Sequence, residues 1–290
     1  MHIILGGTGH VGSAAAAALL RQNEAVTVVT RDAGKAAHLA GQGAEVAVAD
    51  VRDVEALRKV LRRGRRAFLL NPPADPSTDT DAEEQKSVAA IAAALDGSGL
   101  EKVVAESTYG AQPGEGIGDL SVLYGLEQKL AGQAIPASIV RAAYYMSNWD
   151  GALETARRDG VVNSFLPADF ALPMVAPQDL GEAAARLLLE PVDQTGIHCV
   201  EGPERYSTAD VAEAFGRALG KDVRVVTAPR ERWVETYERF GFSKPAAQSY
   251  ARMTATVLDD PMQPEKSERG RISLEDYIAA LVSKQIAPAM

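Results

Sequence analysis

Short apolar runs alternate along the chain with longer segments in which apolar residues recur at helical spacing. The runs contain few polar residues, as expected for strands that are buried on both faces of a parallel sheet. They span residues 2–5, 25–30, 44–49, 67–70, 102–105 and 137–141. The helical segments between them span residues 13–20, 53–61, 82–95 and 120–131. This alternation predicts an α/β fold with a doubly wound parallel Rossmann sheet.

The chain changes character beyond residue 143, where aromatic residues become frequent and short strands mix with helices. We therefore predict an NAD(P)-binding Rossmann domain over residues 1–143 and a smaller C-terminal substrate lobe over residues 144–290, with some of its elements returning to the sheet. Ser207 and Asp210 have the spacing of a helix capping pattern. Helices are expected at residues 177–189, 207–219, 232–239 and 274–282, and a further sheet strand at residues 196–200.

A glycine-rich turn, Gly6-Gly7-Thr8-Gly9-His10-Val11-Gly12, joins the first strand to the first helix. Gly6, Gly9 and Gly12 suit a turn with three glycine positions. The backbone bends sharply at one glycine, approaches a diphosphate closely at another, and packs the helix on the strand at the third. We expect a positive φ at Gly9. The helix N-terminus would point its free N–H groups at the diphosphate, with His10 beside it. The turn predicts dinucleotide binding; a purely structural turn is the alternative.

Two cations follow the second strand and indicate which dinucleotide is bound. Sites for NAD usually end this strand in an acidic residue that accepts from the ribose hydroxyls. Here Thr30 ends the strand, Arg31 follows it, and Lys35 lies one turn further on. Two cations fit a 2′-phosphate, so we predict NADPH as the cofactor, with NADH possible. Asp32 keeps open the alternative that both cations are solvated surface charges.

Polar residues also follow the other strands at the edge where a doubly wound sheet binds its ligand. Asp50 and Val51 are candidates for contacts with the adenine, and Asp53 for the N-cap of the next helix. The order of strands reverses between the first and fourth strands, so the loop with Asn71 and Pro72 is expected to border the cofactor. The hydroxyls of the fifth strand end are expected to face the nicotinamide; they belong to Ser107, Thr108 and Tyr109.

The composition narrows the class of partner. A net charge of -9 argues against nucleic acid or an anionic membrane as the main partner, since both favour a basic face. The basic cluster at residues 62–66 should be solvated, because it lies at the sheet edge opposite the ligand. No apolar run approaches the length of a membrane span, and the four histidines lack metal-ligand spacing, so we expect no metal. Cys199, the only cysteine, is expected to pack in the core of a cytoplasmic monomer or homodimer.

Several segments together resemble the NmrA-like group of atypical short-chain dehydrogenases/reductases. They are the glycine turn, the strand end Val-Val-Thr-Arg, the loop Phe-Leu-Leu-Asn-Pro-Pro and the segment Ile-Val-Arg-Ala-Ala-Tyr-Tyr-Met-Ser-Asn-Trp. The group contains NADPH-dependent quinone and aromatic-ether reductases, azoreductase-like proteins and redox-sensing regulators that bind the dinucleotide without turnover. The resemblance implies that Arg31 and Lys35 hold a 2′-phosphate. It also implies cofactor contacts at Gly6, Thr8, Gly9, Val11 and Gly12.

The chain departs from the wider superfamily at the usual Tyr-x-x-x-Lys pair, in which the lysine lowers the pKa of the tyrosine that donates a proton. Tyr124 is followed four residues later by Gln128, and Lys129 comes five residues later. On a helix the fourth residue lies about 40° round and the fifth about 140° round, so Lys129 faces away from Tyr124. Glu127 matches a glutamate common in the group, with either a structural or a catalytic role.

The leading hypothesis is an NADPH-dependent oxidoreductase acting on a quinone or another aromatic or carbonyl small molecule. The candidate catalytic residues for such a substrate are Ser107, Thr108, Tyr109, Tyr124 and Tyr145. A planar substrate could also be oriented by tyrosines that can equally be core or wall residues: Tyr109, Tyr124, Tyr144 and Tyr145. One alternative is an NAD(P)-sensing regulatory protein without turnover, which the absence of the Tyr-x-x-x-Lys pair favours. Another is a tailoring enzyme that oxygenates or isomerises a polycyclic aromatic metabolite.

Overall fold

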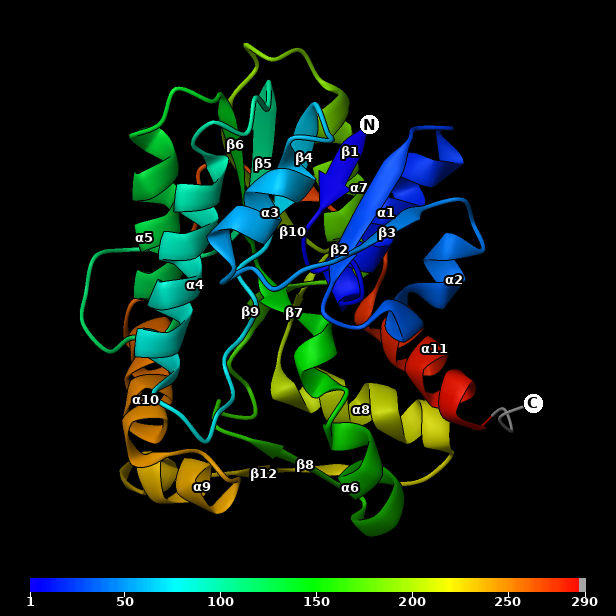
Figure 1. Ribbon diagram of the computed structural model, residues 1–290. Helices are drawn as coiled ribbons and strands as arrows, with labels where there is room; N and C mark the ends of the chain where they lie inside the picture. The colour runs from blue at the N-terminus through cyan, green and yellow to red at the C-terminus, as the bar shows by residue number, and fades with distance from the viewer. Residues whose placement is uncertain (287–290) are drawn as a thin grey trace.

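The computed structural model describes residues 1–286 and contains a large parallel sheet (Figure 1). Its strands are β1 (His2–Ile4), β2 (Val26–Thr30), β3 (Glu45–Val48), β4 (Arg66–Leu69), β5 (Lys102–Thr108), β6 (Ala137–Ala142), β10 (Gly196–Glu201) and β13 (Glu268–Arg269). Their order is β3-β2-β1-β4-β5-β6-β10-β13, and all neighbours pair in parallel. The order reverses at β1, between β2 and β4. The predicted doubly wound α/β sheet is therefore confirmed.

Helices cover both faces of this sheet. One face carries α1 (His10–Arg21) and α7 (Pro177–Leu189), and the other carries α3 (Val54–Leu61), α4 (Thr80–Leu95) and α5 (Asp119–Ala131). Successive residues of β5 point to opposite faces, so Val104 packs toward α1 and α7 while Val103 and Ala105 pack toward α3, α4 and α5. Burial on both faces explains why the strands are almost continuously apolar. Between β2 and β3 the chain forms η1 (Ala33–Ala36) and α2 (Ala37–Ala40).

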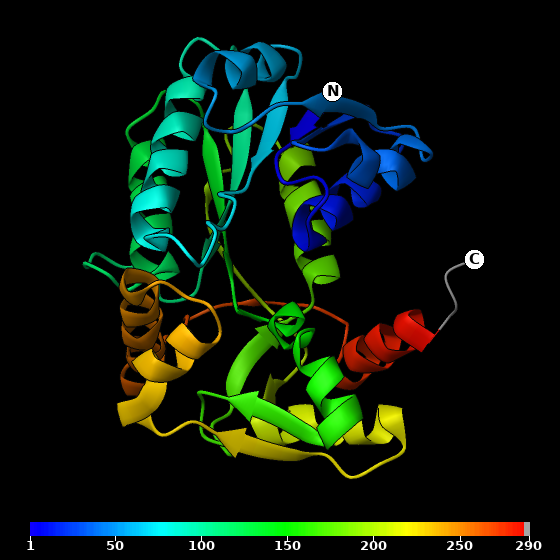
Figure 2. The ribbon, with the colours of Figure 1, turned by 60° about the horizontal axis from the view of Figure 1, so that its bottom comes forward.

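The remaining elements build a lobe with its own core below the carboxyl edge of the sheet (Figure 2). Its strands are β7 (Tyr144–Tyr145), β8 (Val161–Ser164), β9 (Leu172–Val175), β11 (Arg205–Tyr206) and β12 (Arg224–Thr227), which form two small sheets. Its helices are η2 (Met146–Trp149), α6 (Ala152–Asp159), α8 (Thr208–Leu219), η3 (Arg230–Arg232), α9 (Trp233–Arg239), α10 (Lys244–Asp259) and α11 (Leu274–Ile286). The lobe core includes Met146, Trp149 and Phe215, all buried.

Local signals predicted several of these elements correctly. Ser207 and Asp210 form the expected capping box at α8, and Asp53 caps α3 by accepting from the Ala56 N–H. The helix expected from residue 82 begins two residues earlier because Asp79 accepts from the Ala82 N–H. The helix α10 was not predicted, although Ser243 caps it and a proline stands in its first turn, both recognisable start signals.

The chain beyond residue 143 also completes the large sheet and one of its helical layers. Strand β10 pairs with β6, and α7 packs beside α1. The fully buried Lys102, at the start of β5, donates from Nζ to the carbonyls of Pro191 and Gln194, at 3.2 and 2.8 Å. Arg66 donates to the carbonyls of Leu188 and Glu190 at the end of α7. The amino edge of the sheet is thus bonded to the segment that follows α7.

Across residues 1–286, no helix is both long and apolar enough to cross a membrane. In the same part of the chain, no group of three or more His, Cys, Asp or Glu side chains could hold a metal ion. Cys199 is half-buried and packs against the core between the sheet and α1 and α7.

Candidate functional site

The three glycines of the N-terminal turn have different geometries. Gly6 has a φ of +64°, and a Cβ on Gly12 would lie 2.2 Å from the Gly6 carbonyl oxygen. Gly9 has an extended backbone with a φ of −86°, so the expected positive φ at Gly9 is wrong and the left-handed bend occurs at Gly6 instead. A Cβ on Gly9 would meet only the Gly6 oxygen, at 3.3 Å. The turn therefore bends at Gly6, packs at Gly12 and stays open at Gly9.

The open side of the turn is the N-terminus of α1. Gly9 is the N-cap and provides no side-chain acceptor, so the first N–H groups of the helix lack intrahelical partners. These groups belong to His10, Val11 and Gly12. The Val11 side chain is buried in the core, which leaves its backbone for contact with a ligand. Thr8 is half-buried, with Oγ1 3.4 Å from Thr30 Oγ1. This arrangement of free N–H groups suits an anion.

The end of β2 presents two uncommitted cations. Arg31 and Lys35 are exposed, and neither makes a side-chain hydrogen bond or an ion pair within residues 1–286. The Asp32 carboxylate accepts from the Gly34 N–H at 2.9 Å and caps η1. Thr30 Oγ1 holds the Asp32 backbone at 3.1 Å. The acidic residue is thus engaged in the local turn, which leaves the two cations available.

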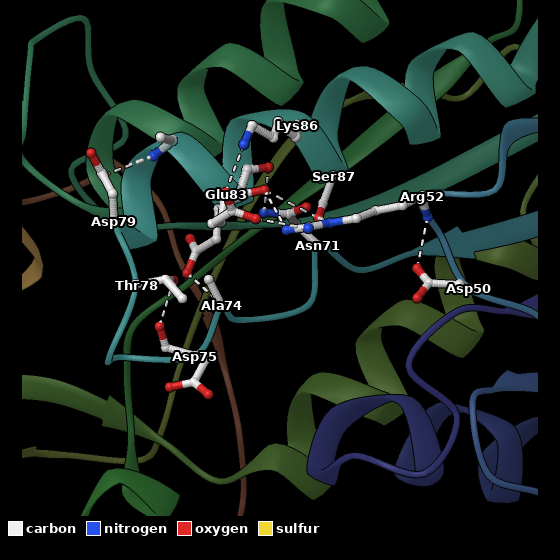
Figure 3. A network of polar contacts seen from close by, with 12 residues as sticks. Asp50, Arg52, Asn71, Ala74, Asp75, Thr78, Asp79, Glu83, Lys86 and Ser87 are labelled. Atoms are coloured by element: carbon white, nitrogen blue, oxygen red, sulfur yellow. Dashed lines mark hydrogen bonds and ion pairs between the residues drawn. The ribbon is translucent and has the colours of Figure 1, made fainter. Parts of the chain in front are cut away.

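The ends of β3 and β4 border the same edge of the sheet (Figure 3). Asp50 is exposed and accepts from the Arg52 N–H, while Val51 is half-buried against the core. Asn71 and Pro72 are half-buried at the start of the loop that leads to α4. Asn71 Nδ2 donates to the Glu84 carbonyl at 3.4 Å, and its buried Oδ1 has no hydrogen-bond partner in the described structure.

The loop after Pro72 is fastened to α4 by Glu84. The Ala74 N–H donates to Glu84 Oε1 at 3.0 Å. Burial, and then the nearby Asp119 carboxyl, raises the pKa of Glu84 to about 8. A neutral Glu84 at physiological pH keeps this hydrogen bond without placing a charge in the interior. The loop thus has a defined anchor beside the candidate cofactor edge.

Ser107 and Glu127 form a closed network on the α5 face of β5. Ser107 Oγ donates to Glu127 Oε1 at 2.5 Å, and Arg141 donates to the same carboxylate through Nε and Nη2 at 2.9 and 2.7 Å. Ser107 is buried under α5. The expectation that its hydroxyl faces the nicotinamide is therefore corrected, because strand alternation turns it to the covered face. Glu127 has a structural position in this network.

The other predicted hydroxyls at the end of β5 also have local partners. Thr108 is half-buried, and its hydroxyl donates to the Tyr109 carbonyl at 3.2 Å. Tyr109 is buried in the core, with its hydroxyl 3.5 Å from Glu201 Oε2. Glu201 also accepts from Ser267 and pairs with Arg269, both at 2.8 Å. Tyr109 therefore points into the sheet toward β10 and β13.

Glu106 was not predicted as a site residue, yet it makes the most unusual contact at this edge. It is 4% exposed and accepts a hydrogen bond from the Tyr145 hydroxyl through one carboxyl oxygen, while the other oxygen has no partner within residues 1–286. Burial raises the pKa of Glu106 to about 7. Burial and the Glu106 carboxyl also raise the pKa of Tyr145. The sequence signal for this position was an acidic residue directly after the apolar run Val103-Val104-Ala105 of β5.

Aromatic side chains of the lobe gather beside Tyr145. The ring of Tyr144 lies 5.8 Å from that of Trp149, and Phe165 stacks on Tyr237 with centroids 4.0 Å apart. Tyr250 meets Tyr237 edge-on at 5.7 Å. Burial, and the proximity of Tyr237, raise the pKa of Tyr144 to about 12. We name these five residues the aromatic group; Tyr144, Phe165 and Tyr250 are half-buried, whereas Trp149 and Tyr237 are buried.

Tyr124 is not among the residues of this group. It is half-buried on α5, near Arg141, whereas Gln128 and Lys129 are exposed. On the α1 side, the ring of His10 lies 3.8 Å from the Asp150 carboxylate, which also accepts from the Tyr277 hydroxyl at 2.8 Å. The glycine turn is therefore linked to the lobe through Asp150.

Comparison with known proteins agrees with this arrangement. The model of the NmrA-like family matches residues 2–257. An NAD(P)H azoreductase of Xenophilus azovorans is 23% identical over 261 residues, which cover 90% of this chain and 88% of that protein.

Solved structures have the same fold. Triphenylmethane reductase of Citrobacter sp., complexed with NADP(H), has a TM-score of 0.80 at 18% identity and covers 97% of this chain and 100% of its own. An NADPH-dependent quinone oxidoreductase from Escherichia coli has a TM-score of 0.77 at 19% identity, with 97% and 99% covered. The family match extends from the first strand into α10, and the chain belongs to the NmrA-like family.

Proposed function

We propose that this protein is an NADPH-dependent reductase that acts on a quinone or another aromatic or carbonyl small molecule. The observation that carries the proposal is the pairing of an open glycine turn at the N-terminus of α1 with two uncommitted cations at the end of β2. The named activities of the azoreductase, the triphenylmethane reductase and the quinone oxidoreductase support a reductase.

The residues at the sheet edge fit the parts of NADPH. The diphosphate would lie against the glycine turn, held by Gly6, Thr8, Gly9, His10, Val11 and Gly12. The turn has room for it at Gly9, where any larger residue would place a Cβ in that space. Arg31 and Lys35 would bind the 2′-phosphate by charge-assisted hydrogen bonds. Asp50 and Val51 would border the adenine, and Asn71 and Pro72 the nicotinamide. When bound, NADPH supplies a hydride from its nicotinamide ring.

The substrate would lie between this edge and the residues from 144 onward, which we propose as the substrate lobe. The half-buried members of the aromatic group, Tyr144, Phe165 and Tyr250, would provide flat walls for a planar acceptor. Thr108 and Tyr145 retain partly exposed side chains at the edge. Hydride addition to a quinone gives a resonance-stabilised oxyanion, which then takes up a proton. We further propose a cytoplasmic monomer or homodimer, because a single half-buried thiol suits a reducing compartment.

The cofactor half of the proposal is tested by titrating NADPH and NADH into wild type and Arg31→Ala. A charge-assisted hydrogen bond contributes roughly 1.5–3 kcal/mol, so NADPH should bind about 10- to 150-fold more weakly to the variant while NADH changes little. Lys35→Ala should show a smaller loss. Equal or tighter binding of NADH by the wild type would overturn the preference for NADPH.

The catalytic half is tested by following NADPH oxidation with a panel of quinones and azo dyes. We expect consumption of NADPH with at least one acceptor. Stoichiometric binding without consumption across the panel would instead favour an NAD(P)-sensing regulatory protein, the candidate supported by the missing tyrosine–lysine dyad. Conversion of a polycyclic aromatic metabolite without net NADPH consumption would favour a tailoring enzyme.

A further inference from the structure

We propose that Tyr145 is the proton donor to the substrate and that the buried Glu106 carboxyl resupplies its proton. The inference rests on the proposed reductase function and identifies the acid that replaces the missing dyad. The hydroxyl of Tyr145 donates to one oxygen of Glu106, and the second oxygen of that carboxyl is buried without a partner in the described structure.

The pair lies where a substrate would meet the nicotinamide. In the register of β4 and β5, Leu69 is opposite Ala105, so Glu106 is level with Leu70, the first residue after β4. The side chain of Leu70 in turn packs against Gly6 of the glycine turn, 3.1 Å from the position of a Cβ there. Tyr145 follows β6 and packs against the core on the same face as Val104. Leu70 therefore lies next to the glycine turn and at the level of Glu106 in the sheet.

The two members of the pair differ in access. Glu106 is 4% exposed, so it cannot reach a substrate directly. Tyr145 is half-buried, and its hydroxyl contacts Glu106. The hydroxyls of Ser107 and Tyr109 are both buried among other carboxylates. Tyr145 is thus the tyrosine that joins a buried acid to the accessible side of the site.

The burial of Glu106 favours its neutral, proton-carrying form. A buried ionised carboxylate needs several hydrogen bonds, and Glu106 receives one. A pKa near 7 lets it gain and lose a proton at physiological pH, as an acid catalyst requires. Two carboxyls face Tyr145: Glu106 from β5 and Asp119 from α5. Their proximity opposes a free phenolate, so Tyr145 can give up its proton only as another arrives.

The transfer can be written with its protons balanced. The carbonyl carbon or ring of the acceptor gains the hydride with its two electrons, and the acceptor oxygen forms an O–H bond as the O–H bond of Tyr145 breaks. For this, the Tyr145 hydroxyl turns from Glu106 to the acceptor, and its oxygen then accepts a hydrogen bond from neutral Glu106. The O–H bond of Glu106 breaks in the same step and re-forms the hydroxyl of Tyr145. Water then returns one proton to Glu106. Ionisation of Glu106 stops the relay, so turnover should fall as the pH rises through about 7.

Two acceptors separate proton delivery from hydride transfer. A 1,4-naphthoquinone must gain a proton when it is reduced, whereas a cationic triarylmethane dye becomes a neutral product by hydride addition alone. Tyr145→Phe should lower kcat for the quinone about 10²- to 10⁴-fold and leave kcat for the dye within a few-fold. Tyr124→Phe is the matched control, because Tyr124 is also half-buried but lies on α5 near Arg141 and outside the aromatic group. It should change neither acceptor selectively.

Glu106→Gln adds a readout that a merely structural role would not move. Its kcat for the quinone should be lower than that of the wild type and should lose the fall near pH 7, with KM little changed; Glu106→Asp should restore part of that pH dependence. This pH profile decides the inference if Tyr145→Phe does not fold or if the dye is not a substrate.

The outcomes distinguish failure of the proton relay from failure of the reductase function on which it rests. Unchanged quinone turnover in Tyr145→Phe, equal losses with both acceptors, or a wild type that reduces only the dye would each overturn the relay and leave the reductase in place. A pH profile shared by wild type and Glu106→Gln would do the same. A wild type that binds NADPH but oxidises it with neither acceptor would overturn the reductase function, and the relay with it.

Discussion

The carboxyl edge of the sheet holds two buried glutamates on opposite faces, and they differ in how they are paired. Glu127, 7% exposed, receives three hydrogen bonds, two from Arg141 and one from Ser107. Glu106, 4% exposed, receives one from Tyr145. Equal burial thus produces an ion pair on the α5 face and an acid with a raised pKa on the other. The partners of a buried carboxyl, more than its depth, decide whether it stabilises the fold or holds a proton.

The largest effect that follows from this contrast is on stability. Glu127→Ala should lower the free energy of unfolding by about 3–5 kcal/mol, because it leaves the Arg141 guanidinium without its buried partner. Glu106→Ala should cost less, since it removes a group that is itself poorly paired. Urea unfolding of both variants at pH 7 makes the measurement. If Glu127→Ala lost less unfolding free energy than Glu106→Ala, Glu106 would be the stabilising glutamate and this contrast would be wrong.

The second effect is a pH dependence of stability that only Glu106 should produce. Burial raises its pKa from 4.5 to about 7, so the folded state binds more protons than the unfolded state between these values. Stability should therefore fall as the pH rises from about 4.5 to 7, by up to about 3 kcal/mol from this group. Glu84 contributes a fall in the same direction in every variant.

The difference between wild type and Glu106→Gln isolates this contribution, because glutamine does not titrate. The two stability curves should converge at low pH and separate toward pH 7, with the variant the more stable. Parallel curves across this range would show that Glu106 is ionised in the folded state throughout.

A smaller effect on stability is expected at Ser107, which donates to Glu127 on the α5 face of the sheet. Ser107→Ala should cost about 1 kcal/mol of stability, because Glu127 keeps both hydrogen bonds from Arg141. Turnover of any acceptor should change little. A selective loss of quinone turnover at unchanged stability would instead give Ser107 the catalytic role that its place in the sequence suggested.

The smallest effect is expected at Tyr124, which lies on the same face near Arg141. Tyr124→Phe should leave quinone turnover within a few-fold of wild type, since Lys129 is exposed five residues away and gives it no partner. Steady-state rates with saturating NADPH are sufficient for this test. A loss of about 10²-fold or more, the size typical of a lost general acid, would move the proton donor to the α5 face.

The sequence was most informative where backbone periodicity sets the structure. The reversal of strand order at β1, a bend within the glycine turn and the caps at Asp53 and Ser207 were predicted from local patterns, and the structure contains them. The edge strand β13 was not predicted. The positive φ was assigned to Gly9 instead of Gly6, because the spacing of glycines does not say which of them bends.

The side-chain contacts at the end of β5 could not be obtained in the same way. Alternation could have separated Glu106 from Ser107, but the partners Tyr145 and Glu127 come from elements 39 and 20 residues away. Similarly, β8 and β12 pair across a large separation in sequence, which no local pattern specifies. Tertiary contacts of this kind decide which hydroxyl is accessible and which carboxyl is neutral.

The contacts of Lys102 constrain how the chain folds during synthesis. Its buried ammonium is bonded to the carbonyls of Pro191 and Gln194, and α7 covers the same sheet face as α1. A nascent chain that ends near residue 143 has β5 but lacks these acceptors and α7, so the apolar sheet face that α7 covers stays in contact with water. We therefore expect the parallel sheet to close only after residues up to β10 have left the ribosome. A fragment of residues 1–143 expressed alone should collapse without reaching the native sheet.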